Sequence, residues 1–470
     1  MNIRQDFTNS TNGETSLPVV GVIKGLPDHD LLDLVQRQTL RYFWDHGHPL
    51  SGMARERRTD EDYTLYDCSE TVTTGGTGFG IMGMLAGVER AWLKRDEVCA
   101  RLEKIVSFLE KTETHHGVFP HFIDSRTGRA NFFESVGEGE QAVAVPVAER
   151  GGNLVETAFL FMGLLTARQY FSKSTPEETD LRKRINRLWH HIEWDSHLSA
   201  DGKNLQWLNH PETGLGEWPV TGWNEAVITH VLAASSPTHA VSPDVYRTGW
   251  CSGMDFYKNG DSFYGIKLPL GPAGGGPLFF SHYSFLGLDP RGLKDGNASY
   301  WKQNVAHTLI NRAYCIDNPA GHAGYGANCW GLTASDTPGG YNVHAPVKGK
   351  LGLDNGTITP TAALSSFPYT PIHSMEALRH FYEDRGDDLW TEYGFVDAFN
   401  PSQNWVAPSH LAIDQGPIVA MIENHRSGLL WNLFMSCPEV KFGLNRLGFE
   451  SPHLNQPELS REKTQTLSIS

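Results

Sequence analysis

The chain has 470 residues, of which 39% are hydrophobic and 20% are charged, a composition typical of a globular protein rather than a disordered one. Its formal net charge of -15 argues against a nucleic acid or an anionic membrane as partner, because either partner requires a basic face. No stretch reaches about 18 consecutive apolar residues, the length that predicts a membrane helix. The 6 cysteines are scattered without a CxxC pair, which favours free thiols over a disulfide framework.

The amino-terminal segment shows no secretory signal, since residues 1–21 are polar and lack both a basic start and an apolar core. We therefore expect a cytoplasmic protein, or a periplasmic or secreted one if a signal has been removed. Residues 1–27 are rich in Asn, Thr, Ser and Gly and are expected to form a flexible lead-in. Residues 28–449 are expected to form one domain, and residues 450–470 a tail.

The spacing of apolar residues predicts helices from residue 28 onward. Leu31, Leu32, Val35, Leu40 and Phe43 fall near one face of a first helix that ends around residue 44. Further helices are expected near residues 78–92, 96–111, 154–171, 176–194, 223–234, 278–286, 300–314, 359–366, 374–382 and 417–434. Strand-like alternation is scarce, although residues 122–150 interrupt the pattern as a loop insertion or a short hairpin. About a dozen helices without a linker indicate one all-α domain, for which an α/α toroid is the expected architecture.

Two carboxylates occur in contexts that suggest glycosidic bond cleavage, which needs one acid to protonate the leaving oxygen and a second carboxylate. Glu225 follows Trp223 and Asn224 and is expected at the start of an apolar helix. An acid there can simply complement the helix dipole, which lowers its pKa. A general acid at this position therefore needs burial beside Trp223, or a neighbouring carboxylate, to raise the pKa. The preceding Trp and Asn favour the catalytic interpretation.

The second carboxylate is Asp414, just ahead of a helix expected to begin near Pro417. A catalytic acid and a loop aspartate that binds nearby backbone amides explain it equally well. Glu156 lies three residues after Asn153, and this spacing matches a capping box that by itself explains both residues. Glu423, within the later helix, is expected to form a structural ion pair.

Tryptophans in Gly-, Asn- and Pro-rich stretches suit stacking on the apolar faces of sugars, although buried core residues are the alternative. The candidate substrate-binding residues are Trp207, Trp218, Trp223, Asn224, Trp330, Asp336, Trp405 and Gln415. The sequence has no HExxH motif, no Cys/His ligand grouping, no GxSxG elbow and no P-loop. We therefore expect neither a metal nor a cofactor.

Several long motifs resemble the glycoamylase-like domain. They are residues 31–44 (LLDLVQRQTLRYFW), 72–83 (VTTGGTGFGIMG), 153–170 (NLVETAFLFMGLLTARQY), 222–225 (GWNE), 265–292, 328–336 (NCWGLTASD), 358–370 (ITPTAALSSFPYT) and 411–417 (LAIDQGP). Within that group the sequence is most similar to glycoside hydrolase family 144, the β-1,2-glucanases, over about residues 28–449.

The resemblance implies an (α/α)6 barrel and an inverting hydrolase that needs no metal and releases short β-1,2-gluco-oligosaccharides such as sophorose. The acidic cleft residues of the family fall on Glu156, Glu225 and Asp414. We assign Glu225 as general acid, Asp414 as general base, acting directly or through a water or a substrate hydroxyl, and Glu156 as a subsite or supporting acid. Endo cleavage of β-1,2-glucan is the expected reaction. An exo-acting sophorose-releasing enzyme, a transglycosylase and a non-catalytic glycan-binding protein stay open as alternatives.

Two stretches depart from the family pattern. Residues 129–151 form a longer connection than usual into the motif that contains Glu156, and residues 205–220 differ from the usual Trp-rich run before GWNE. Either difference could reshape the subsites and convert an endo cleft into an exo pocket.

Overall fold

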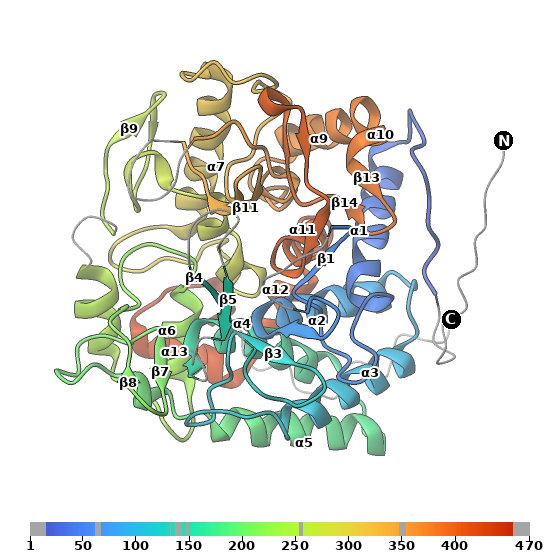
Figure 1. Cartoon of the computed structure of the whole chain (residues 1–470). Coiled ribbons are helices and arrows are strands. Elements are labelled where there is room, and N and C mark those ends of the chain that lie inside the picture. Colours follow the sequence, from blue (N-terminus) through green and yellow to red (C-terminus); the bar gives the residue numbers. More distant parts are fainter. Residues whose placement is uncertain are drawn as a thin grey trace, which may run out of the picture.

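Helices dominate the computed structural model, which describes residues 16–61, 67–131, 133–136, 143–146, 151–252, 257–346 and 354–454 (Figure 1). The α-helices are α1 (Asp28–Trp44), α2 (Thr74–Glu89), α3 (Arg95–Leu109), α4 (Leu154–Tyr170), α5 (Pro176–His191), α6 (Val227–Ser235), α7 (Tyr300–Asp317), α8 (Pro360–Leu364), α9 (Pro371–Arg379), α10 (Gly386–Leu389), α11 (Ala412–Arg426), α12 (Leu429–Met435) and α13 (Pro438–Leu447). Short 3-10 or π turns are η2 (Trp194–His197), η3 (Val245–Gly249), η4 (Trp250–Ser252), η5 (Ala273–Gly275), η6 (Leu278–Ser281), η7 (Tyr283–Leu286), η8 (His380–Asp384), η9 (Pro401–Gln403) and η10 (Pro452–Leu454).

The strands are short and pair antiparallel in small sheets. They are β1 (Arg57–Thr59), β2 (Thr71–Thr73), β3 (Phe122–Asp124), β4 (Phe133–Val136), β5 (Val143–Pro146), β6 (Gly152–Asn153), β7 (Leu208–His210), β8 (Gly214–Leu215), β9 (Ser262–Phe263), β10 (Ile266–Lys267), β11 (Ala334–Thr337), β12 (Gly340–Val343), β13 (Trp390–Thr391), β14 (Gly394–Phe395), β15 (Phe399–Asn400), β16 (Trp405–Val406) and β17 (Ser409–Leu411). Two pairs lead directly into helices that carry candidate acids, β6 with β7 into α4 and β1 with β17 into α11, while β2 with β3 leads into α2. The mostly helical class is confirmed, whereas closure of the helices into an (α/α)6 barrel stays a prediction.

Helices α2 and α4 pack closely against each other because glycines line their contact. A Cβ on Gly78 would lie 2.1 Å from the Phe159 carbonyl oxygen, and a Cβ on Gly163 would lie 2.2 Å from the Gly78 carbonyl oxygen. Each glycine inside a helix costs roughly 1 kcal/mol of helix propensity, which close backbone packing here offsets. The first turns of the two helices therefore lie side by side.

Several helix starts differ from the sequence-based boundaries, and two of these differences change where the candidate acids lie. Helix α6 begins at Val227, because the Asn224 side chain accepts the Ala226 N–H at 2.9 Å and closes a turn ahead of the helix. Glu225 thus precedes the first turn instead of lying in it. Helix α11 begins at Ala412, directly after β17, so Asp414 lies in the first turn and Pro417 lies inside the helix. The expected start near Pro417 was wrong because pairing of β17 with β1 positions the chain earlier.

The two ends of the described chain are packed against the body of the protein. The Val20 N–H donates to Gln38 at 2.8 Å and the Ile23 N–H donates to the Tyr382 hydroxyl at 2.9 Å. The expectation of a flexible lead-in is therefore wrong for residues 16–27, while residues 1–15 lie outside the described residues. At the other end, Glu450 exchanges two backbone hydrogen bonds with Lys294, at 2.7 and 3.0 Å. Residues 455–470 lie outside the described part of the chain.

Residues 122–150 contain an antiparallel hairpin of β4 and β5, which confirms the hairpin alternative. Its two ends adjoin β3 and β6, next to the first turns of α2 and α4. All 6 cysteines are free thiols, as expected. Over the described ranges, no helix is both long and apolar enough to cross a membrane.

Candidate active site

Glu156 lies in the first turn of α4, where it contacts the first turn of α2. The Asn153 side chain caps α4 by accepting the Glu156 N–H at 3.0 Å, so the capping half of the sequence pattern is confirmed. The return bond of a capping box is missing, because the Asn153 N–H donates to the Phe119 carbonyl at 2.8 Å. The Glu156 carboxylate instead accepts the Gly75 N–H at 3.0 Å. The side chain therefore bridges two helix starts, with His121 Nε2 at 3.5 Å from its second oxygen.

Glu225 is a partly exposed carboxyl in the turn before α6. Its carbonyl accepts the Ser284 hydroxyl, which in turn accepts the Ile228 N–H at 3.0 Å, so η7 fixes this turn. Burial raises the pKa of Glu225 from 4.5 to about 7, and the negative charge of Glu156 adds to the increase. The condition placed on a general acid at this position is therefore met.

Tyr283 lies among the three candidate carboxylates. Burial raises the pKa of its phenol well above the usual range, and Asp414, Tyr341, Glu225 and Glu156 each raise it further by charge repulsion. The charges of Asp414, Glu225 and Glu156 thus all act on one phenol. The ring is held by Phe279, stacked at 5.2 Å between centroids. Three helix starts distant in sequence thus bring these carboxylates into one site.

Tyr341 on β12 is an exposed aromatic residue whose phenol is affected by the candidate acids. Its surface is 51% exposed, yet burial raises the pKa of its phenol well above the usual range, and Asp414 and Asp397 raise it further. Tyr341 therefore offers an accessible aromatic face close to the candidate acids, as sugar stacking requires.

Asp414 lies in a buried acidic cluster. It is 1% exposed, and neither of its carboxyl oxygens accepts a hydrogen bond from an N–H or O–H group within the described residues. The cluster also contains Asp397, whose Oδ2 accepts the Asp336 N–H at 2.7 Å. Arg57 supplies a positive charge through bonds to Asp336 at 2.9 and 3.2 Å and to Glu56 at 2.9 Å. Asp336 thus forms a buried ion pair with Arg57, and its expected sugar contact stays a prediction.

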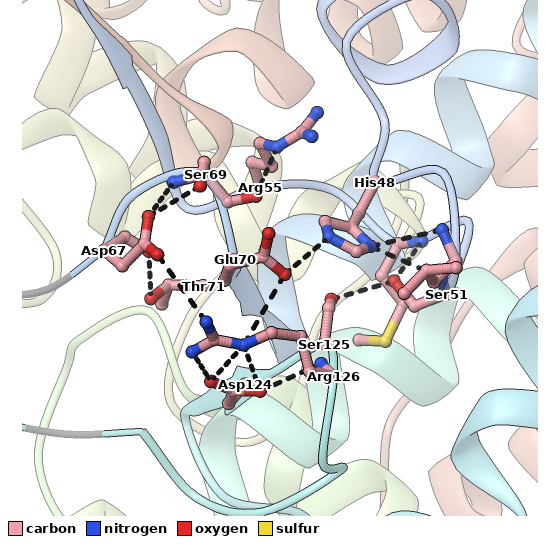
Figure 2. Close-up of polar contacts among 12 residues, drawn as sticks. His48, Ser51, Arg55, Asp67, Ser69, Glu70, Thr71, Asp124, Ser125 and Arg126 are labelled. Atoms are coloured by element: carbon pink, nitrogen blue, oxygen red, sulfur yellow. Dashed lines mark hydrogen bonds and ion pairs between the residues drawn. The ribbon is translucent and has the colours of Figure 1, made fainter.

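A polar network fixes the segment that leads into α2 (Figure 2). Glu70, just before β2, lies 3.3 Å from His48 Nε2 and 3.8 Å from Arg126 Nε. Arg126 also pairs with Asp124 at the end of β3, while the Ser125 N–H donates to the Glu70 carbonyl at 2.9 Å. These contacts join the two sides of the β2–β3 ladder, which ends at the helix start that binds Glu156. The network thus supports the site without entering it.

Three predicted binding residues are core residues. The rings of Trp223 and Trp330 are fully buried, and Trp223 packs with centroid distances of 6.0 Å to Phe285 and 5.8 Å to Tyr300. Gln415 is 1% exposed and donates its amide to the Phe395 carbonyl at 2.8 Å. Their expected contacts with sugar are therefore wrong, since none of the three side chains reaches the surface.

Three other predicted tryptophans retain accessible surface. Trp207 is half-buried, and its carbonyl accepts the Leu154 N–H at 2.9 Å, at the start of α4. Its own N–H donates to the carbonyl of Trp218, a side chain that is 70% exposed. Trp405 is half-buried on β16. Sugar contact by these rings stays a prediction, as it does for Asn224, whose amide also builds the turn before α6.

The sequence-based search missed Asp397, Arg57 and Tyr283. Asp397 had one usable signal, since it is a single acid within the apolar run FVDAF, where an isolated charge is costly unless it has a function or a partner. The aromatic run around Tyr283 and the charged run around Arg57 show no comparable signal. Among the described residues, no group of three or more His, Cys, Asp or Glu side chains could hold a metal ion.

Comparison with known proteins identifies the family. A family model described as Glycoamylase matches residues 217–438. An exo β-1,2-glucooligosaccharide sophorohydrolase (non-reducing end) of Parabacteroides distasonis is 42% identical over 443 residues, which cover 90% of this chain and 58% of that protein. The chain thus spans little more than half the length of this curated relative.

Solved structures agree with this result. The endo-β-1,2-glucanase from Chitinophaga pinensis, in complex with sophorotriose and glucose, is 46% identical, with a TM-score of 0.84 over 92% of this chain and 100% of that one. The β-1,2-glucanase from Parabacteroides distasonis is 42% identical, with a TM-score of 0.82 over 90% of this chain and 60% of that one. This chain therefore belongs to the glycoamylase family, as a relative of the β-1,2-glucanases of glycoside hydrolase family 144.

Proposed function

We propose that this protein hydrolyses β-1,2-glucan or β-1,2-linked gluco-oligosaccharides, with residues 28–449 as a catalytic domain arranged as an (α/α)6 barrel. The named activities of two relatives at 42% and 46% identity support this substrate class. Glu225 protonates the leaving oxygen and Asp414 acts as general base, so that the anomeric configuration is inverted. Glu156 is a supporting acid whose charge raises the pKa of Glu225.

The observation that carries this proposal is the environment of Glu225. With a pKa of about 7, the carboxyl retains its proton near neutral pH, which an ordinary glutamate does not. Glu225 is half-buried rather than fully buried, and Tyr341 offers an exposed aromatic ring on which a sugar could stack. A proton held at neutral pH on an accessible carboxyl is the property required of a general acid.

Replacement of Glu225 by glutamine tests the assignment. Glu225→Gln keeps the size of the side chain but removes the proton, so we expect kcat to fall by about a thousandfold or more while folding and oligosaccharide binding persist. The matched control is Glu423→Gln, a buried acid that Arg90 holds with bonds of 2.9 and 3.0 Å away from the proposed chemistry. A Glu225→Gln enzyme that retains more than a few per cent of the wild-type rate would exclude Glu225 as the general acid.

Endo cleavage is the first of two modes that we consider. The Chitinophaga pinensis relative, named an endo-β-1,2-glucanase, is covered by this chain over its full length, which supports this mode. Products from long β-1,2-glucan should then show mixed lengths at early times. A flat reducing-sugar signal with retained binding would instead indicate a glycan-binding protein, and products longer than the substrate would indicate a transglycosylase.

Exo release of sophorose is the second mode, and two observations favour it. The curated Parabacteroides distasonis relative is named an exo sophorohydrolase acting at the non-reducing end. In addition, the β4–β5 hairpin comes shortly before α4 and Glu156 in the chain, in the stretch that departs from the family pattern. In the same time course, exo action releases one product size from the first minutes.

A further inference from the structure

Helix α6, which Glu225 precedes, is capped from a distant part of the chain. The first N–H groups of a helix have no partner inside the helix, and the side chain of the N-cap residue commonly accepts one of them. The N-cap of α6 is Ala226, whose side chain has no oxygen that could accept a hydrogen bond. The Ile228 N–H donates instead to the Ser284 hydroxyl at 3.0 Å. Ser284, on the turn η7, therefore does for α6 what a local serine or aspartate does for other helices.

The same hydroxyl holds the peptide group between Glu225 and Ala226. Ser284 is 0% exposed, and its hydroxyl donates to the Glu225 carbonyl while it accepts the Ile228 N–H. At the other end of that peptide group, the Ala226 N–H donates to the Asn224 side chain at 2.9 Å. The peptide group is thus bound at both its oxygen and its nitrogen, and rotating it would break both bonds. Because the carbonyl and the side chain of Glu225 share one Cα atom, this fixes the direction in which the side chain leaves the backbone.

The turn η7 is itself held by the two helices that carry the other candidate acids. The ring of Tyr283 lies 5.8 Å from the ring of Phe159 on α4, measured between centroids. The Leu286 carbonyl accepts the side-chain amide of Asn424 on α11 at 2.9 Å. One short turn therefore contacts α4, α11 and, through Ser284, the turn that precedes α6.

We propose that Ser284 is a positioning residue for catalysis, which holds Glu225 at a fixed place relative to the other two candidate acids. This inference deepens the proposed function, because it rests on Glu225 as the general acid. Proton transfer depends on the placement of the acid, and a misplacement of about 1 Å can cost about a hundredfold in rate. A buried hydroxyl that served stability alone would leave the rate of the folded enzyme unchanged, and this difference separates the two roles.

The first test is Ser284→Ala, which removes both the donor to the Glu225 carbonyl and the acceptor of the Ile228 N–H. We expect kcat on a β-1,2-linked oligosaccharide to fall by about ten- to a hundredfold, because the acid is no longer held toward the leaving oxygen. KM should stay within about threefold of wild type, since the buried Ser284 side chain does not reach a substrate. An unchanged kcat in folded Ser284→Ala enzyme would overturn the proposal.

Two further variants separate the position of the acid from a general loss of stability. Ser235→Ala is the matched control, because Ser235 is also buried, lies at the other end of α6 and donates its hydroxyl to the Val231 carbonyl at 2.6 Å. Its kcat should stay within about twofold of wild type, and a fall as large as that of Ser284→Ala would contradict the proposal. Ser284→Thr keeps the hydroxyl and should recover kcat to within about threefold of wild type, although its extra methyl group lowers stability. A Ser284→Thr enzyme as slow as Ser284→Ala would show that the hydroxyl does not position the acid.

Amide hydrogen exchange gives a measurement that is independent of activity. The Ile228 N–H should exchange about tenfold faster or more in Ser284→Ala than in wild type, because its acceptor is gone, while exchange near the end of α6 stays the same. Equal rates at Ile228 would overturn the proposal. If Ser284→Ala does not fold, Ser284→Cys replaces it in both assays, with smaller changes of the same sign, because a thiol is a weak donor and acceptor. If wild type cleaves no β-1,2-glucan while exchange at Ile228 changes as expected, the proposed function fails and the hold of Ser284 on this turn stands.

Discussion

The pKa of Glu225 offers a quantitative test of how the site works, through the substitution Glu156→Gln. Glutamine can still accept the Gly75 N–H that Glu156 accepts at 3.0 Å, so the junction of α2 and α4 is expected to persist. What changes is charge: one negative neighbour of Glu225 is removed. Because a nearby negative charge disfavours ionisation, its loss must lower the pKa of Glu225.

The magnitude follows from the pKa of about 7. At pH 7 about half of the molecules carry the proton on Glu225, whereas at the ordinary value of 4.5 about one molecule in three hundred would. Burial is the larger cause of the increase and the charge of Glu156 the smaller one. We therefore expect Glu156→Gln to shift the alkaline limb of the kcat/KM profile to lower pH, by about one pH unit or less.

The assay is kcat/KM on a defined β-1,2-linked oligosaccharide from about pH 4 to 9, at constant ionic strength. The expected profile keeps most of the wild-type rate on its acidic side and declines earlier on its alkaline side. An alkaline limb that stays in place or rises would refute the electrostatic coupling between Glu156 and Glu225. Loss of activity at every pH, with folding intact, would show that Glu156 takes part directly in the reaction. Glu156 would then replace Asp414 as the general base.

Two further predictions concern the scaffold. Glu423→Gln should leave kcat/KM unchanged but lower the free energy of unfolding by about 2 kcal/mol in urea titrations, because bonds from Arg90 lose their charged acceptor. Burial raises the pKa of Glu423, but hydrogen bonds from Arg90, Ser427 and Gln36 lower it by more, so the net effect is a decrease. The difference in unfolding free energy between wild type and Glu423→Gln should therefore be full above the pKa of glutamate in the unfolded chain. It should disappear as the pH falls through the pKa of Glu423 in the folded protein. A difference that does not depend on pH would contradict this explanation. Gly78→Ala would place a Cβ 2.1 Å from the Phe159 carbonyl oxygen and should cost about 3 kcal/mol of unfolding free energy. Gly83→Ala, whose Cβ would lie 3.3 Å from Val419, is the control, and equal losses would refute the tight α2–α4 contact.

Local sequence signals predicted what depends on local structure. The apolar spacing from Leu31 to Phe43 gave the first helix, and the Asn153 cap gave the start of α4 at the correct residue. Where the local signal was misleading, a tertiary contact determined where the helix begins. Pro417 suggested a helix start, but the pairing of β17 with β1 begins α11 at Ala412.

The sequence by itself determined the mostly helical class, the family, and the three carboxylates Glu156, Glu225 and Asp414 as the residues to examine. It could not determine their protonation, because a pKa depends on burial and on charges that come from distant segments. Only the tertiary structure places Glu156 close enough to raise the pKa of Glu225, and Asp414 in a buried acidic cluster. The tertiary structure likewise determined which side chains are buried. A tryptophan next to a candidate acid has the same sequence context whether its ring faces a substrate or the core, and the ring of Trp223 packs in the core.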